Sequence, residues 1–371
     1  NEMDSPNGLY YAAMDADTDG EEGKYYSFNL NEIESISGEQ INLFNSFFNI
    51  DIDSPWDNNK FLLLPTRDLE SWLAINSLDK DKFLKMKESW FEEIMKIKSK
   101  RTKPRIDDKS IVSWNALAIV GLIDAYDAFK DDLFLSKAKN MFSTLLKRGY
   151  KDNMLVHTFK DRQYQDGVLE DYAYLSKAAI RLFQTTGEEH YFDKSKEIID
   201  NSIKYFKDED SDLLLYTTNK ELFTKVVTID DGVIPSPNSI IAEQLFNIGH
   251  IIFDDYYLDK SNKMVSSIKE IIDGNINSYS VWANNILNRV ELFYEIAVIG
   301  SDSDSKTKLI SEKLLPNVIL VQSNTESDIP LFVDRYFDDE TYIYVCQNKT
   351  CQRPETNIKY ALDQIPYLKT N

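Results

Sequence analysis

Carboxylates, aromatic rings and amides stand next to one another at several points of this sequence. Asp171 directly precedes Tyr172, and Trp114 directly precedes Asn115. Paired carboxyl groups can supply a general acid and a general base, aromatic rings stack on the apolar faces of pyranoses, and amides hydrogen-bond sugar hydroxyls. These residue types therefore predict a sugar site, which either acts on its substrate or only binds it.

A pair of carboxyl groups is expected to carry the acid–base chemistry. Asp171 supplies one of them, and an acid from the loop that contains Asp17 and Glu22 supplies the other, with Asp231 in reserve. The predicted substrate-binding residues are Trp114 and Tyr172, which would stack on the sugar, Asn115 and Asn238, which would orient it, and Ser239 and His157. No Gly-x-Gly-x-x-Gly motif or P-loop is present, and we predict neither a cofactor nor a metal.

Each of these residues also has an architectural interpretation. Asp171 could be a helix N-cap, and Asn238 could serve a turn in a segment rich in serine and proline. Trp114 and Tyr172 could belong to the core, and His157 could be an ordinary packed or exposed histidine. The sequence leaves both interpretations open.

An internal repeat positions these residues. The segments Ser113–Lys147, Glu170–Lys204 and Ser236–Glu270 align without gaps, and each one predicts a helix, a short acidic turn and a second helix. The first helices are apolar almost all round, which predicts burial on every side, and the second helices are amphipathic. This contrast favours an inner ring of buried helices within an outer ring of half-exposed ones.

Long insertions between the repeats decide between two helical architectures. Units of an α-solenoid abut, whereas Arg148–Leu169 and Tyr205–Pro235 intervene here, each with a strand-like piece, Met154–Thr158 and Leu213–Thr217. We therefore predict a mainly α fold, an (α/α)6-type barrel of helical hairpins, complete or incomplete, over residues 1–293. A small α/β segment is expected over 294–371. The insertions then gather at the face where the inner helices begin, which is where the candidate residues lie.

Composition and charge exclude several classes of partner. The chain has 371 residues and a formal net charge of −20, which argues against nucleic acid and anionic membranes because both need clustered cations. No apolar run reaches the length of a spanning helix. The polar N-terminus has no initiator Met and no signal-peptide core, so it reads as a cut within a longer protein. A cytoplasmic location is expected.

Two short motifs could carry a disulfide or a metal site. The role of the first is undecided from the sequence, and the second does not predict an EF-hand. Cys346 and Cys351 could be structural thiols, close a small disulfide or supply half of a zinc site. The run from Asp15 to Gly20 imitates the start of an EF-hand, but position twelve is Tyr26 instead of Glu. An EF-hand is therefore not predicted.

Five motifs in the same order resemble the YyaL-like, spermatogenesis-associated protein 20 family. They are Ala16–Tyr26, Arg101–Leu117, Leu169–Gly187, Asp231–Ser239 and Val345–Pro354. The resemblance implies a thioredoxin-like domain followed by a six-hairpin, glycosidase-like barrel, a fold that sugar 2-epimerases share. This chain has no Cys-x-x-Cys and resembles only the C-terminal portion, and Pro237 stands where the family more usually has Gly.

Two functions follow as hypotheses. The first is a carbohydrate-active or carbohydrate-binding barrel whose partner is a mono- or oligosaccharide. Epimerisation is less favoured than hydrolysis or binding, because the resemblance implies that epimerases of this fold use several histidines and only His157 is placed to serve here. The second is a non-catalytic scaffold for the thioredoxin-like domain of the full-length protein, with Cys346 and Cys351 as the redox contact.

Overall fold

The computed structural model describes residues 2–151, 154–160, 163–219, 224–272, 274 and 276–368. The chain forms two compact units. The hairpin unit consists of Asn1–Tyr11 and Lys109–Asn371, and the N-terminal unit consists of Ala12–Asp108. None of the described helices is long and apolar enough to cross a membrane.

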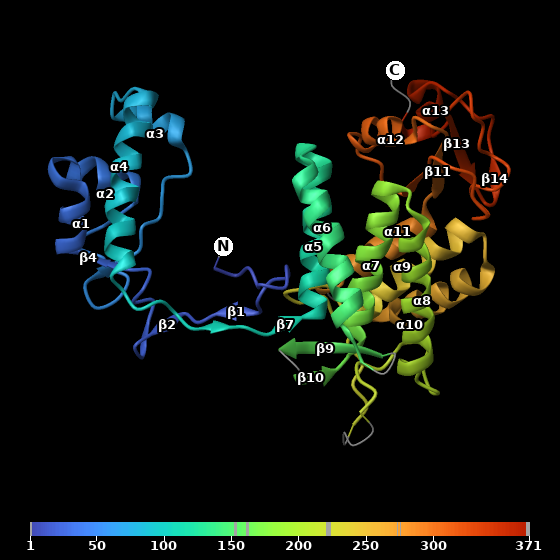
Figure 1. The fold of residues 1–371 in the computed structure, drawn as a ribbon, viewed down its shortest axis with the longest axis horizontal. Helices are drawn as coiled ribbons and strands as arrows, with labels where there is room; N and C mark the ends of the chain where they lie inside the picture. Colours follow the sequence, from blue (N-terminus) through green and yellow to red (C-terminus); the bar gives the residue numbers. More distant parts are fainter. Residues whose placement is uncertain are drawn as a thin grey trace. The chain divides into compact units, whose positions relative to one another are not determined.

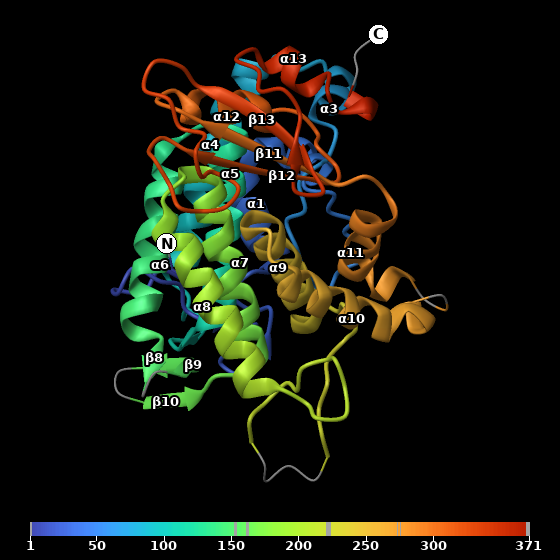
Figure 2. The same ribbon diagram turned by 90° about the vertical axis from the view of Figure 1, so that its right-hand side faces the viewer.

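Three helical hairpins and one further helix form the body of the hairpin unit (Figures 1 and 2). They are α5 (Val112–Phe129) with α6 (Asp132–Arg148), α7 (Leu169–Thr186) with α8 (Glu189–Phe206), α9 (Pro237–Ile252) with α10 (Asp255–Ile272), and α11 (Ser280–Val290). The first helices α5, α7 and α9 pack side by side in chain order, and each second helix packs along its own partner. The predicted mainly α class, with hairpins of the (α/α) barrel type, is confirmed.

Burial follows the predicted inner and outer rings with one exception. In α7 and α9 nearly every side is buried, whereas α8 buries a single stripe that includes Phe192 and Ile198. The prediction of burial on every side is wrong for α5, which leaves Trp114 exposed. Within the hairpin unit, α5 is the first of the inner helices and has α7 as its only inner-helix neighbour among the described residues.

The turn of each hairpin lies at the same position of the repeat. Lys130, Gly187 and Phe253 are equivalent by register, and all three adopt the left-handed conformation that ends a helix, with φ of 56°, 72° and 54°. Glycine is required only at the second turn, because a Cβ on Gly187 would come within 2.9 Å of the Gln322 carbonyl oxygen.

The insertion before α7 and a short strand that precedes α5 together form a small antiparallel sheet. Its strands are β7 (Ser110–Ile111), β8 (Tyr150–Lys151), β9 (Met154–Lys160) and β10 (Gln163–Asp166), in the order β10-β9-β7 with β8 also paired to β9. The strand expected at Met154–Thr158 is confirmed. The one expected at Leu213–Thr217 is wrong, since that segment forms only an isolated bridge between Lys207 and Leu214.

A four-stranded sheet follows the hairpins. Its strands lie in the order β12 (Val318–Ser323), β11 (Tyr294–Ile299), β13 (Tyr342–Gln347) and β14 (Thr350–Cys351), with α12 (Ser303–Ser311) and α13 (Ile358–Leu362) beside them. One face packs on the hairpins through Ala297 and Ile299, and the other contacts Ile310 and Ala361. The change of pattern at residue 294 therefore lies inside the hairpin unit.

The N-terminal unit has its own aromatic core. Its elements are β1 (Ala13–Met14), β2 (Asp17–Thr18), β3 (Glu21–Glu22), β4 (Phe28–Asn29), α1 (Leu30–Ser37), α2 (Ile41–Phe47), β5 (Lys60–Phe61), α3 (Leu69–Ile75), α4 (Lys80–Ser99) and β6 (Ile106–Asp107). Phe47 contacts the rings of Trp72, Phe83 and Trp90. Arg101, near the end of this unit, holds the segment around residues 24–32 near its start, because its guanidinium donates to three main-chain carbonyls and to Glu32.

Candidate functional site

Asp171 lies at the start of α7 and is completely buried. It is the third residue of the first turn, so its carboxylate accepts a hydrogen bond from the Val168 N–H at 2.9 Å. The same carboxylate accepts the Ser113 N–H from the start of α5 at 3.1 Å. It therefore joins two neighbouring inner helices, and it is an N3 residue instead of the N-cap that the sequence suggested.

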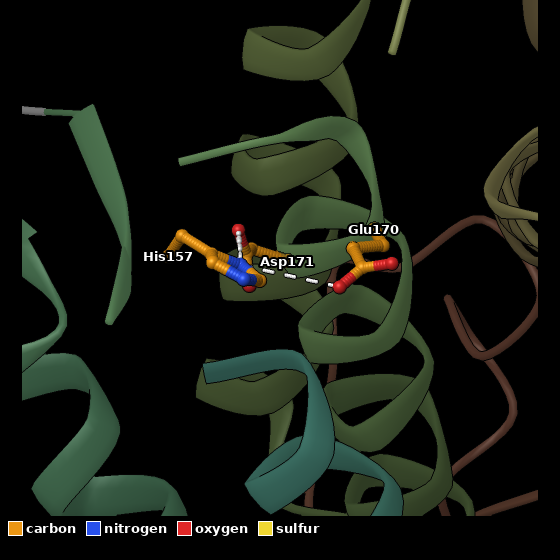
Figure 3. Close-up of side chains that lie close together, drawn as sticks. All are labelled: His157, Glu170 and Asp171. Atoms are coloured by element: carbon orange, nitrogen blue, oxygen red, sulfur yellow. Dashed lines mark hydrogen bonds and ion pairs between the residues drawn. The ribbon is translucent and has the colours of Figure 1, made fainter. Parts of the chain in front are cut away.

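His157 on β9 is the third partner of this carboxylate. Its Nδ1 lies 3.0 and 3.1 Å from the two oxygens of Asp171, and its side chain keeps 24% of its surface exposed (Figure 3). The hydrogen bond to Asp171 raises the pKa of His157 above its usual value of 6.5, with burial and Lys109 opposing. Burial raises the pKa of Asp171, and the bond from His157 opposes that rise. No hydrogen bond to Nε2 of His157 is found among the described residues.

Glu170 is the second carboxylate beside His157. Its Oε1 accepts the Ser113 hydroxyl at 3.0 Å and lies 3.9 Å from Nδ1 of His157 (Figure 3). Burial, together with the neighbouring Glu170 carboxylate, raises the pKa of the Tyr216 hydroxyl. Unlike Asp171, Glu170 keeps part of its side chain exposed.

These three side chains are also the candidate metal ligands. One ligand atom from each of His157, Glu170 and Asp171 lies within 4.8 Å of the others. However, the carboxylate of Asp171 already accepts two main-chain N–H groups and the histidine. This arrangement fits a proton shared between a histidine and an aspartate better than it fits a cation.

Asn115, Tyr172 and Asn238 occupy the same position of the repeat, and each binds main-chain groups that lie earlier in the chain than its own helix. Asn238 accepts the Leu214 N–H at 2.8 Å and donates to the carbonyls of Leu214 and Thr228, both at 3.0 Å. We call these three residues the clamps.

The other two clamps act in the same way. Asn115 accepts the Tyr10 N–H at 2.8 Å and donates to the Tyr10 carbonyl at 3.1 Å. The Tyr172 hydroxyl accepts the Leu155 N–H at 3.0 Å. All three clamp side chains are buried, with exposed fractions of 0 to 2%. This geometry differs from the expectation that they contact a sugar, because their polar atoms are occupied by the main chain.

The clamps nevertheless position the site. Leu155 and Leu214 lie two residues before His157 and Tyr216 respectively. Holding the main chain at the leucines therefore fixes where the histidine and the tyrosine project. Glu170 and Tyr216 were not predicted as site residues. The repeat register could not have found Tyr216, because the gap-free units end before both insertions; only the hydrogen bonds at Leu155 and Leu214 make Tyr216 correspond to His157.

Asp231 and Ser239 also serve the architecture. Asp231 accepts the Ser236 N–H and the Val281 N–H, both at 2.8 Å, so it joins the starts of α9 and α11. The Ser239 hydroxyl donates to Asp231 at 3.2 Å, and Pro237 takes the first position of α9, where a missing N–H costs nothing.

The remaining predicted residues are exposed. Trp114, on the first turn of α5 next to Ser113, has 46% of its surface accessible. Asp17 and Glu22 face each other across the β2–β3 hairpin of the N-terminal unit. The structure brings together His157, Asp171 and Glu170, and it places Trp114 one residue from their partner Ser113.

Comparison with known proteins finds, among others, one sequence relative and two solved structures of low similarity. It is 21% identical to spermatogenesis-associated protein 20 of Homo sapiens over 95% of this chain and 51% of that protein. A family 76 glycoside hydrolase (mannosidase) of Bacteroides thetaiotaomicron aligns in structure at 11% identity and a TM-score of 0.38, covering 71% of this chain and 66% of that one. A sugar epimerase from a ruminal bacterium aligns at 16% identity and a TM-score of 0.38, covering 72% and 67%.

The predicted resemblance to spermatogenesis-associated protein 20 is thus confirmed as sequence similarity over nearly the whole chain. No protein-family model matches the chain. The chain spans between 38% and 51% of the length of the curated relatives it matches.

Proposed function

We propose that the hairpin unit is a carbohydrate-active domain in which His157 transfers protons to and from a sugar. The observation that carries this proposal is the pairing of His157 Nδ1 with the fully buried carboxylate of Asp171. A histidine held in this way has a fixed ring orientation, and the carboxylate stabilises the imidazolium that forms when the ring accepts a proton. Nε2 is then the atom that meets the substrate.

This arrangement changes the role first expected for Asp171. An aspartate with no exposed surface cannot contact a sugar, so it is a positioning residue for His157. Glu170 is the accessible carboxylate and becomes the second acid–base group. Trp114 stays the candidate for stacking, because its side chain is exposed and it directly follows Ser113, which donates to Glu170 and to Asp171.

The geometry favours proton transfer over hydrolysis by two carboxylates. Glycosidases use two carboxyl groups that both reach the sugar and stand roughly 5–9.5 Å apart. Here Glu170 and Asp171 offer oxygens within 4.8 Å of each other, and one of the two carboxyl groups is inaccessible. A histidine next to an accessible carboxylate suits the removal of a proton beside the carbonyl of an open-chain aldose and its return to the same carbon or its neighbour.

Deuterium exchange tests this function directly. The chain is incubated in D2O with reducing mono- and disaccharides, and mass spectrometry and NMR follow deuterium at the carbon next to the carbonyl. We expect incorporation with at least one sugar, its loss in His157→Gln, and a strong decrease in Asp171→Asn. His190→Gln is the matched control, because His190 is exposed on α8 and does not contact the site.

Other outcomes overturn the proposal in distinguishable ways. Release of new reducing ends from an oligosaccharide without deuterium exchange would assign hydrolysis instead. A rise in melting temperature with no exchange and no cleavage would assign binding alone. Activity abolished by a chelator and restored by a divalent cation would assign His157, Glu170 and Asp171 to a metal.

A further inference from the structure

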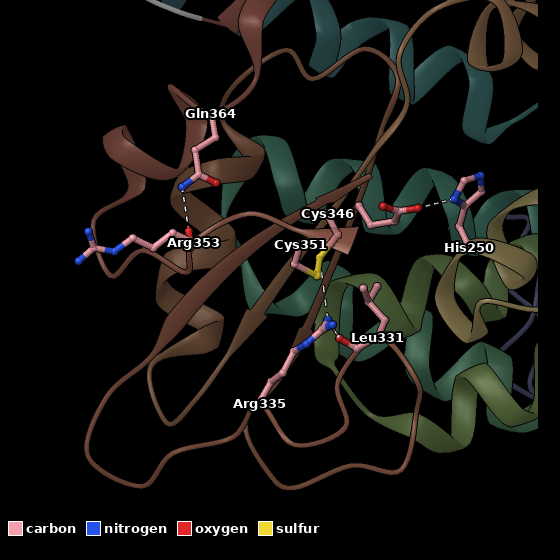
Figure 4. Close-up of a disulfide and its surroundings, with 8 residues drawn as sticks. His250, Leu331, Arg335, Cys346, Cys351, Arg353 and Gln364 are labelled. Atoms are coloured by element: carbon pink, nitrogen blue, oxygen red, sulfur yellow. Dashed lines mark hydrogen bonds and ion pairs between the residues drawn. A yellow bond between two sulfur atoms is a disulfide. The ribbon is translucent and has the colours of Figure 1, made fainter. Parts of the chain in front are cut away.

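A disulfide in the C-terminal sheet lies beside charged side chains that the site above does not use. Cys346 on β13 and Cys351 on β14 are directly opposite in the ladder and are bonded to each other. Glu295 on β11 is directly opposite Cys346 on the other side. Opposite residues of antiparallel strands project from the same face, with Cβ atoms about 4.5–5.5 Å apart, so the registers place the carboxylate and both sulfurs on one face. Figure 4 shows the disulfide between the two cysteines.

The two sulfurs differ in access. Cys346 has no exposed surface, whereas Cys351 is only partly covered. An incoming thiolate therefore reaches Cys351 alone, and Cys346 must be the leaving sulfur.

The guanidinium of Arg335 lies next to Cys346, the sulfur that becomes a negatively charged thiolate when the disulfide is broken. Nη1 of Arg335 lies 3.9 Å from Sγ of Cys346 and donates to the Leu331 carbonyl at 2.5 Å, which holds it in place (Figure 4). The guanidinium also lies 5.3 Å from the centre of the Tyr344 ring. A cation beside a sulfur stabilises the thiolate, which makes that sulfur a better leaving group.

Glu295 supplies a buried proton acceptor on the same face. Its Oε1 lies 2.5 Å from Nδ1 of His250, and its side chain is 1% exposed. Its Oε2 is buried and has no hydrogen-bond partner among the residues that the structure describes. An unpaired buried carboxylate oxygen is costly, which points to a group that accepts a proton there. His250 keeps 15% of its side chain exposed and so connects this carboxylate to solvent.

We propose that Cys346–Cys351 is a thiol–disulfide exchange site that accepts two electrons from a dithiol. A thiolate of the dithiol attacks Sγ of Cys351, the S–S bond breaks, and the electron pair leaves on Sγ of Cys346 beside Arg335. The second thiolate of the dithiol then attacks its own sulfur in the mixed disulfide and expels Cys351.

The products of this exchange are an oxidised dithiol and two cysteine thiols. The two protons that the dithiol gives up balance the two that the cysteines take. Glu295 and His250 carry the proton that reaches the buried Cys346.

The test uses the full chain with dithiothreitol as the dithiol, and iodoacetamide labelling with mass spectrometry counts the free thiols. The native protein should contain none before reduction. Arg335→Met should slow reduction at least tenfold, and Arg335→Lys should retain most of the rate. Arg353→Met is the matched control, because that arginine is exposed on the segment after β14, and among the described residues its guanidinium has no hydrogen bond, while its main-chain carbonyl accepts one from Gln364 (Figure 4).

Single-cysteine variants test the order of attack. Oxidised glutathione should modify Cys351 in Cys346→Ser and leave Cys346 unmodified in folded Cys351→Ser. Glu295→Gln should change the pH profile of reduction while circular dichroism stays native. Two free thiols in the air-exposed protein, modification of Cys346 first, or equal rates for Arg335→Met and the native chain would each overturn the proposal.

Discussion

Replacing Asn238 by alanine removes a clamp and should loosen the segment that carries Tyr216. The side chain makes three hydrogen bonds to main chain, two with the buried Leu214 and one with the half-buried Thr228. Each is worth about 1 kcal/mol net, so the substitution should cost about 3 kcal/mol. Tyr172→Phe removes one hydrogen bond, to Leu155, and should cost about 1 kcal/mol.

Hydrogen exchange measured by mass spectrometry reports the free energy of local opening at individual segments, and so measures this loss of stability at Leu214. A loss of about 3 kcal/mol corresponds to a roughly 140-fold faster exchange of the Leu214 amide when reclosing is faster than exchange. Asn140→Ala is the control, because Asn140 is exposed on α6 and should change stability by less than about 0.5 kcal/mol. If protection at Leu214 falls less than threefold in folded Asn238→Ala, the clamp does not hold this segment and the reasoning is refuted.

Three further predictions concern the charged groups. Asp171→Asn should lower the pKa of His157, measured by NMR titration, because the hydrogen bond to the carboxylate raises it. Since the pKa of His157 is raised in the folded state, its contribution to stability is fully present below a pH of about 6.5 and is lost as the pH rises through the folded pKa. Urea unfolding at several pH values should show this decline. Asp171→Asn should make the free energy of unfolding depend less on pH over the same range. Arg101→Ala should destabilise the N-terminal unit by about 4 kcal/mol, because four hydrogen bonds from a charged donor are lost, whereas Arg105→Ala, at a largely exposed ion pair, should change tryptophan-monitored unfolding little.

The hairpins were predictable because the repeat is long and its apolar pattern is strong. The register placed the turns at one position, and the structure adds that this position is left-handed even where it is lysine or phenylalanine. The strand expected at Leu213–Thr217 failed because Asn238 takes the place of a neighbouring strand for Leu214. Propensity alone cannot report a partner 24 residues away.

Two of the candidate site residues, His157 and Asp171, are in contact in the structure, and the sequence did not indicate that contact. His157 and Asp171 were both candidates, yet nothing in the sequence joins a histidine on a strand to an aspartate in the first turn of the next helix. Asn115 was expected to hydrogen-bond a sugar, because the sequence does not show whether an amide binds a ligand or the main chain. Its main-chain partner, Tyr10, lies 105 residues earlier and could not be inferred. Each insertion contains the sequence aspartate–glycine–valine, at 166–168 and at 231–233. Only Gly167 is required there, since a Cβ would come within 2.3 Å of the Leu155 carbonyl oxygen, whereas Gly232 has open space.

The clamps fix the position of the first part of each insertion independently of how many residues follow it. Because Tyr172 and Asn238 hold Leu155 and Leu214 directly, the residues that follow can vary in number without changing where the insertion starts. Closing a longer loop costs only about 0.6 kcal/mol for each doubling of its length. A longer insertion after the held leucine therefore costs little stability and can change the surface around this end of the hairpins, while the histidine and tyrosine two residues beyond each leucine stay in place.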